Sequence, residues 1–373
     1  MKGFTHFISG MAVASFFEQA VHMASQESSF ILCLGGLFGI LPDTLDFKLA
    51  KYFYKSDVEI KPDPNNLDAR EIANGIAKAV NKAIETGKGS VQLHTMQLAS
   101  NRWRSYQLRF DTKTSEICVD IGPEVDTGQI PFDGTELNDP EKAHARVKVN
   151  CEFYQQFDKV SNIAIMTGPC FEFEKREDGK MEIVFLPWHR QWSHSFTLGM
   201  LIAFIVGIIS YLIIGPDSYV NGYPTRYYWL PKWSLYPLII LFGSMVHIIE
   251  DSTGFMGNNL FYPFTKKRTD GLGFMSASEG IPNFLFVWTA VICIIYNLDR
   301  FRWNPNGNVA AAIANPMSFW FWFYIVPVAI MIYFFLKGKK EKALQAKENG
   351  TSEKTVDFDG PQAVESETDA SII

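Results

Sequence analysis

The sequence predicts a multi-span α-helical membrane protein of about six transmembrane helices, with a soluble α+β domain inserted between the second and third. Several apolar segments approach the roughly 20 residues that a helix needs to cross the hydrocarbon core. Between them lies a long polar stretch, residues 48–187, which is large enough for a domain of its own. Short clusters of His and Asp also stand at the ends of the apolar segments, where ionisable groups are costly.

Six apolar segments are the candidate spans. Residues 7–24 are interrupted by polar side chains, and residues 30–41 are short and rich in glycine. The remaining four are almost unbroken and are bordered by Trp and Tyr, as in the aromatic belt of a membrane protein; they are residues 195–214, 235–249, 284–296 and 319–336. We interpret the first segment as a span rather than a secretory signal peptide, because no uncharged core precedes a small-residue cleavage site.

Basic residues predict the orientation. Lys337, Lys339, Lys340 and Lys342 follow the last span, and residues 266–268, Lys-Lys-Arg, follow the fourth. The positive-inside bias makes these segments cytoplasmic. Both termini and the insertion are then cytoplasmic too, and all four His/Asp clusters fall on the cytoplasmic face.

The insertion, residues 48–187, is predicted to hold one helix packed on an antiparallel sheet. Residues 67–86 form an amphipathic pattern with apolar residues at every fourth position, and Gly87 is a typical stop. We expect His94 and His144 to be ordinary histidines. Strand-like segments separated by turn residues follow the helix; they are residues 91–98, 103–110, 116–121, 146–153, 162–166, 170–173 and 181–185.

The end of the chain, residues 337–373, is Lys-rich and then acidic, with few large apolar residues, so we expect a disordered tail. The predicted organisation is therefore membrane helices in residues 1–47, the insertion in 48–187, four further helices in 188–336, and the tail. The five cysteines lack the spacing of a disulfide framework, which favours a reducing compartment. The net charge of −6 gives no reason to expect nucleic-acid binding.

The four clusters are the candidate functional residues. His247 and Asp251 share one helix face at a spacing of four. Asp43 and Asp46 are close enough to repel each other unless a cation lies between them. Each cluster alone has a plainer explanation, such as a helix-end hydrogen bond or a capping Asp, but their joint placement on one face favours a shared metal site. The candidate metal ligands are His6, Asp43, Asp46, His189, His194, His247 and Asp251.

These motifs resemble the YdjM-type family of bacterial membrane proteins, over the first four spans and not over the insertion, the last two spans or the tail. Members often carry Thr three residues after the last Asp, where this chain has Gly254. The family is described as membrane-bound metal-dependent hydrolases with phospholipids among the suggested substrates, so the resemblance implies a hydrolase of the bacterial inner membrane. The matching motifs are Thr5-His6, Leu41-Pro42-Asp43 with Asp46, His189-Arg190 with Ser193-His194-Ser195, and His247 with Asp251, followed by Gly257 and Leu260-Phe261-Tyr262-Pro263.

The clusters together with this resemblance imply a metal-dependent hydrolase that cleaves a phosphodiester or ester, such as a phospholipid, at the cytoplasmic interface. Imidazoles and carboxylates suit zinc, manganese or iron, and seven ligands are enough for two ions. We expect Asp46 or Asp251 to accept a proton from the attacking water, and Arg190 to hold the anionic group of the substrate.

Two other hypotheses stay open. The same His and Asp residues would suit the ion or proton path of a transporter. Alternatively, the metal is purely structural and the soluble domain binds a protein partner.

Overall fold

The computed structural model describes residues 3–126, 130–154, 161–163, 169–220, 230–254, 256–265, 268–274, 280–302 and 311–348. The chain divides into two compact units. Met1–Lys48 and Arg190–Asp359 form the first unit, and Leu49–His189 and Gly360–Ile373 form the second.

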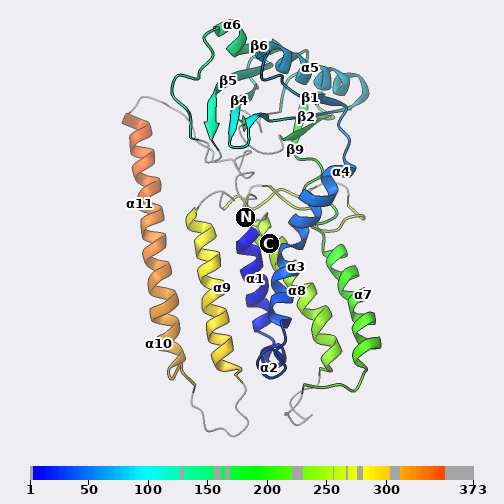
Figure 1. The fold of residues 1–373 in the computed structure, drawn as a ribbon, viewed down its shortest axis with the longest axis vertical. Coiled ribbons are helices and arrows are strands. Elements are labelled where there is room, and N and C mark those ends of the chain that lie inside the picture. Colours follow the sequence, from blue (N-terminus) through cyan, green and yellow to red (C-terminus); the bar gives the residue numbers. More distant parts are fainter. Residues whose placement is uncertain are drawn as a thin grey trace. The chain divides into compact units, whose positions relative to one another are not determined.

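The first unit is helical. Its helix α1 packs against α3, α8 and α9, and α7 packs against α8 (Figure 1). The π-helix η1 (Asp46–Ala50) follows α3. The helices are α1 (Gly3–Ser15), α2 (Glu18–Gln26), α3 (Ile31–Leu45), α7 (Phe196–Ile214), α8 (Lys232–Ser252), α9 (Gly280–Arg300), α10 (Pro316–Trp320), the π-helix η3 (Phe321–Ile325) and α11 (Val326–Glu348).

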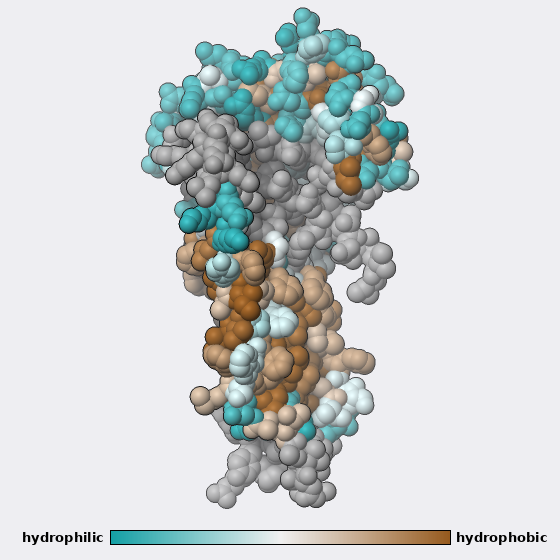
Figure 2. Space-filling model, turned by 90° about the vertical axis from the view of Figure 1, so that its left-hand side faces the viewer, coloured by the Kyte–Doolittle hydropathy of each residue, from teal (hydrophilic) through white to brown (hydrophobic). Residues whose placement is uncertain are grey.

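Within the described residues, four helical stretches are long and apolar enough to cross a membrane: Phe196–Ile214, Lys232–Ser252, Gly280–Arg300 and Pro316–Gly338. They coincide with the last four predicted spans. Their outward surface is strongly apolar, as Figure 2 shows for one face of the unit. Trp322, Phe334 and Leu336 are among its exposed large side chains. An apolar surface of this kind suits contact with lipid.

The prediction of about six spans is not confirmed. The first apolar segment is broken into α1 and α2 at Phe16 and Phe17, just before the polar pair Glu18 and Gln19. Helix α3 has 15 residues, which is roughly 22 Å of helix against a hydrocarbon core of about 30 Å.

Small residues bring α1, α3 and α8 into backbone contact. A Cβ atom added to Gly10 would lie 2.1 Å from the carbonyl oxygen of Gly35, and one added to Gly243 would lie 2.6 Å from the same oxygen. A Cβ atom on Gly39 would lie 2.4 Å from the carbonyl oxygen of His6. Such close approach is typical of helices that pack inside membranes.

Helix α11 continues past residue 336, where the sequence predicted a disordered tail, and ends at Glu348. Lys, Glu, Ala and Gln are good helix formers. Lys337 and Glu341 add an i,i+4 ion pair with a separation of 3.9 Å. The rest of the predicted tail, residues 349–373, lies outside the described residues.

The second unit holds the predicted helix, here α5 (Ala69–Thr86). Asp68 accepts a hydrogen bond from the backbone N–H of Arg70 at its start, and Gly87 ends it with a φ of 88°. The strands are β1 (Val58–Ile60), β2 (Lys88–Leu93), β3 (Met96–Ala99), β4 (Arg102–Asp111), β5 (Glu116–Asp126), β6 (His144–Lys148), β7 (Ser161–Ile163), β8 (Cys170–Lys175) and β9 (Met181–Phe185), with short helices α4 (Lys51–Phe53) and α6 (Pro140–Ala143).

The strands form two sheets, where the sequence predicted one. One sheet has the order β1-β2-β8-β9 and the other β3-β4-β5-β6, with β7 paired to β4. All pairs are antiparallel except β1 with β2. Predicted strand 91–98 is divided between β2 and β3, which belong to different sheets, and residues 164–166 of another predicted strand lie outside the described part. Phe110 joins the two sheets by ring contacts at 5.7 Å with both Phe171 and Phe173.

Candidate metal centre

Five of the predicted site residues converge at one end of the helical unit, where α1 and α7 begin and α3 and α8 end (Figure 1). His6 belongs to α1, Asp43 to α3, and His247 and Asp251 to α8, while His194 directly precedes the N-cap of α7. The side chains of four of them are 0–1% exposed, and that of Asp43 is 18% exposed. Ionisable groups buried this deeply need compensating partners.

Each of the three imidazoles has an oxygen acceptor at its Nδ1 atom. His247 Nδ1 donates to the carbonyl oxygen of Gly39 at 2.7 Å. His6 Nδ1 lies 2.8 Å from Glu250 Oε2. His194 Nδ1 lies 2.9 Å from Ser193 Oγ, whose hydroxyl donates to Asp46 Oδ1. In the neutral imidazole a proton on Nδ1 leaves a lone pair on Nε2, so the three Nε2 atoms are set up as ligands.

Two of these Nε2 atoms face each other. His194 Nε2 and His247 Nε2 are 3.0 Å apart. Two lone pairs at that distance repel each other unless a proton or a cation lies between them. Burial lowers the pKa of His194, but hydrogen bonds to Asp251, Asp43 and Asp46 outweigh burial and raise that pKa well above its ordinary value. The short separation and the surrounding carboxylates therefore favour a proton or a cation between the two nitrogens.

The same two nitrogens and two carboxylate oxygens are spaced like the ligands of one ion. His194 Nε2 lies 3.3 Å from Asp43 Oδ1 and 3.3 Å from Asp251 Oδ2. His247 Nε2 lies 3.7 and 3.4 Å from the same two oxygens. With bonds of about 2.0–2.2 Å, the ligands of a tetrahedral zinc ion are about 3.3–3.6 Å apart. This group, Asp43, His194, His247 and Asp251, could hold a metal ion.

Asp46 lies on the other side of His194, away from the Nε2 atoms. Its Oδ2 accepts the backbone N–H of Arg190 at 2.8 Å and lies 3.2 Å from His194 Nδ1. The side chain is fully buried. Its contacts are those of a residue that orients His194, whereas the sequence grouped Asp46 with the metal ligands.

Arg190 is held inside the protein. Its Nη2 lies 3.0 Å from Asp251 Oδ1, and its Nη1 donates to the carbonyl oxygens of Asp251 and Met256. The residue is 7% exposed, and its φ of 58° lies in the left-handed region that only a few non-glycine residues adopt. The sequence predicted that Arg190 holds a substrate anion. Its guanidinium would have to give up some of these contacts to do so.

His189 is the last residue of the second unit. It is buried and lies beside Trp188, with a distance of 5.9 Å between ring centroids. The helical unit, which carries the other predicted ligands, begins again at Arg190.

Glu250 is the residue that the sequence analysis missed. Its side chain is 4% exposed, and it reaches His6 from the end of α8. A glutamate at the end of an apolar span was the available signal, because such residues usually have a function or a partner.

The loop after α8 supports this arrangement. The carbonyl oxygen of Met256 accepts from Arg190, and a Cβ atom on Gly257 would lie only 1.4 Å from the carbonyl oxygen of Thr269. Gly257, which belongs to the motifs that resemble the family, therefore leaves no room for a side chain at this position. Thr253 Oγ1 donates to the carbonyl oxygen of Glu250 at 2.6 Å, so this hydroxyl caps the helix.

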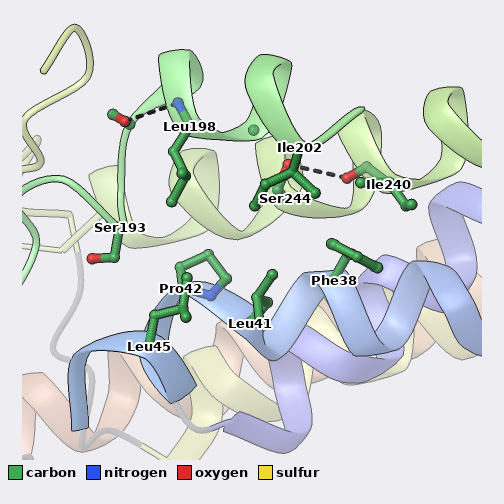
Figure 3. Close-up of a pocket in the computed structure, with 11 residues that line it drawn as sticks. Phe38, Leu41, Pro42, Leu45, Ser193, Leu198, Ile202, Ile240 and Ser244 are labelled. Carbon is green, nitrogen blue, oxygen red and sulfur yellow. Dashed lines mark hydrogen bonds between the residues drawn. The ribbon is translucent and has the colours of Figure 1, made fainter. Parts of the chain in front are cut away.

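A narrow apolar crevice lies between α3, α7 and α8 (Figure 3). Pro42 and Ser193 line it, and these residues directly precede Asp43 and His194 in the chain. The crevice therefore adjoins the cluster. Its apolar lining comes mainly from Phe38, Leu41, Leu45, Leu198, Ile202 and Ile240.

The family model of the YdjM inner membrane protein matches residues 157–338. The match includes His194, His247 and Asp251, and it extends over the last two apolar helices, further than the resemblance read from the motifs. It begins after His6, Asp43 and Asp46. No curated protein and no solved structure matches the chain.

Proposed function

From the likeness of residues 157–338 to the YdjM inner membrane proteins, we propose that this chain is a membrane-embedded, metal-dependent hydrolase. Its substrate is a phosphodiester or ester, and its metal ligands are His194, His247, Asp43 and Asp251. The observation that carries the proposal is the pair of imidazoles whose Nε2 atoms meet at 3.0 Å between two carboxylates. Zinc or manganese suits this mixture of nitrogen and oxygen ligands.

A divalent ion bound there would lower the pKa of a coordinated water to near neutrality and so supply the nucleophile. The chain's own residues keep the ligands in place. Gly39 and the Asp46–Ser193 pair orient His247 and His194. Arg190 neutralises part of the charge of Asp251.

Substrate and water approach the cluster from the side of Asp43. This carboxylate is 18% exposed, whereas those of Asp46, Glu250 and Asp251 are 0–4% exposed. The sequence favoured Asp46 or Asp251 as the group that takes the proton of water. Asp46 is the weaker candidate, because Arg190 and Ser193 already donate to its two oxygens.

The apolar helices beside the cluster support a lipid substrate. The crevice lies between α3, α7 and α8, and α7 and α8 have the length and apolarity of membrane spans. A lipid that lies along these helices could bring its ester or phosphate to the cluster without leaving the bilayer.

The test is hydrolysis of a panel of phospholipids and of a water-soluble phosphodiester by the detergent-purified full chain, with and without added zinc or manganese. We expect turnover that a chelator abolishes, and a loss of at least about 100-fold in the variants His194→Ala and His247→Ala. His144→Ala is the matched control, because His144 is exposed and pairs with Asp120 in the second unit. Turnover that persists in both cluster variants would overturn the proposal, and so would metal binding without any turnover.

A further inference from the structure

The third imidazole of the cluster has an unused nitrogen. His6 is fully buried, and its Nε2 atom has no hydrogen-bond partner. Asp251 Oδ1 and Asp43 Oδ2 lie 3.4 and 3.9 Å from this nitrogen. These are the carboxylate oxygens opposite those that face His194 and His247.

His6 is oriented in the same way as the two other imidazoles. Glu250 Oε2 holds its Nδ1 at 2.8 Å, so the neutral ring directs the lone pair of Nε2 toward Asp43 and Asp251. The ring of His6 lies against that of His247, with 3.8 Å between centroids. A carboxylate behind an imidazole is the usual support of a metal-binding histidine.

The charge of the cluster leaves room for a second cation. Asp43, Asp46, Glu250 and Asp251 bring four negative charges when ionised, and Arg190 contacts Asp251 with one permanent positive charge. Divalent ions bound there would offset the negative charge and so favour the approach of an anionic substrate.

We propose that His6 Nε2, Asp43 Oδ2 and Asp251 Oδ1 hold a second divalent cation, so that the two aspartates bridge a pair of ions. The proposal rests on the first metal position described above. Asp251 Oδ1 also forms an ion pair with Arg190 Nη2 at 3.0 Å, and a carboxylate oxygen has lone pairs for both partners.

A second ion favours phosphate esters among the proposed substrates. Paired ions stabilise the attacking and the leaving oxygen of an in-line displacement at phosphorus. The second cation would also hold the anionic group of the substrate. Arg190 is poorly placed for that role, because it already contacts Asp251 and Met256. In the reaction, the oxygen of water forms a bond to phosphorus and the bond from phosphorus to the leaving oxygen breaks. One proton of the water passes to the leaving oxygen, which becomes an alcohol, and the other stays with the phosphate product.

The test is the metal content of the full-length protein, loaded with manganese and freed of excess ion, measured by plasma mass spectrometry. We expect two ions per chain in the wild type and in the control His144→Ala, and one ion in His6→Ala. Electron paramagnetic resonance should show coupled manganese ions in the wild type and an isolated ion in His6→Ala. Because His6→Ala could perturb packing, Glu250→Gln serves as a second variant, and we expect its second ion to bind about 10–100-fold more weakly.

The outcomes separate the two proposals. One ion per chain in both the wild type and His6→Ala would overturn the second position and leave the first intact. No bound ion in the wild type would overturn both. Two coupled ions that persist in His6→Ala, or an unchanged second affinity in Glu250→Gln, would show that other residues hold the second ion.

Discussion

At the scale of single residues, hydrogen bonds at Nδ1 decide what the cluster can bind. Each imidazole has its Nδ1 atom engaged in this way, by Gly39, by Glu250 or by the Asp46–Ser193 pair. The residue types of the cluster could be read from the sequence. Their division into ligands and supports could not, because the contacts of Asp46 join residues 144 and 147 positions apart, and Glu250 meets His6 across 244 positions.

Asp46→Asn tests the supporting role of Asp46. The variant keeps the size of the side chain but loses the charge that faces His194 Nδ1, so we expect metal affinity to fall about 10–100-fold while the fold is retained. Competition with a metal-sensitive dye measures the affinity. Asp120→Asn is the control, since Asp120 forms a comparable pair with His144 at 2.7 Å in the second unit. An affinity equal to that of the wild type would rule out this role.

Arg190→Met tests whether Arg190 is a structural counter-ion. The change leaves the buried carboxylate of Asp251 without its guanidinium, which should cost about 3–5 kcal/mol of stability in the absence of metal. Added divalent metal should restore part of the lost stability. Arg109→Met is the matched control, because Arg109 pairs with Asp111 at a partly exposed site, where a loss of about 0–1 kcal/mol is expected. Thermal unfolding in detergent compares the two variants; equal losses would contradict the assignment.

At the scale of elements, small residues bring α1, α3 and α8 close enough for one cluster to form. The four long apolar spans and helix α5 were predictable, because each carries its own pattern of apolar residues and stop signals. The break between α1 and α2 was harder to predict, since apolar residues continue up to Phe17. The division of the strands into two sheets depends on pairing between distant segments, such as β2 with β8, which no local pattern encodes.

Gly35→Ala tests the close packing of α3. The new methyl group would lie 2.3 Å from the carbonyl oxygen of Gly10, so the helices must separate, at a cost of about 1–3 kcal/mol. We expect a lower unfolding temperature and weaker metal binding together, because α3 carries Asp43 and the Gly39 carbonyl. In Gly338→Ala, where nothing lies within 4 Å of the new atom, both should stay unchanged. Normal metal binding in Gly35→Ala would show that this contact does not position the site.

At the scale of the whole molecule, we propose that the metal centre lies at the cytoplasmic face of the inner membrane. The likeness to inner membrane proteins and the four apolar helices support the membrane location, and the Lys residues after the last span motivate the orientation.

Reporter fusions test that orientation. We expect green fluorescent protein to be fluorescent when it is fused after Lys342, and alkaline phosphatase to be active when it is inserted at Asp217, after α7. The reverse pattern would place the cluster on the outer face, and its substrate would then have to be sought there.

X-ray absorption at the metal edge of the purified, zinc-loaded full chain tests whether the His/Asp cluster is the metal centre. We expect nitrogen and oxygen ligands at about 2.0–2.2 Å, scattering from imidazole rings, and no sulfur near 2.3 Å. We also expect this spectrum to change in His247→Ala. A sulfur shell, or an identical spectrum in the variant, would show that the metal binds elsewhere and that the His/Asp cluster is not the metal centre.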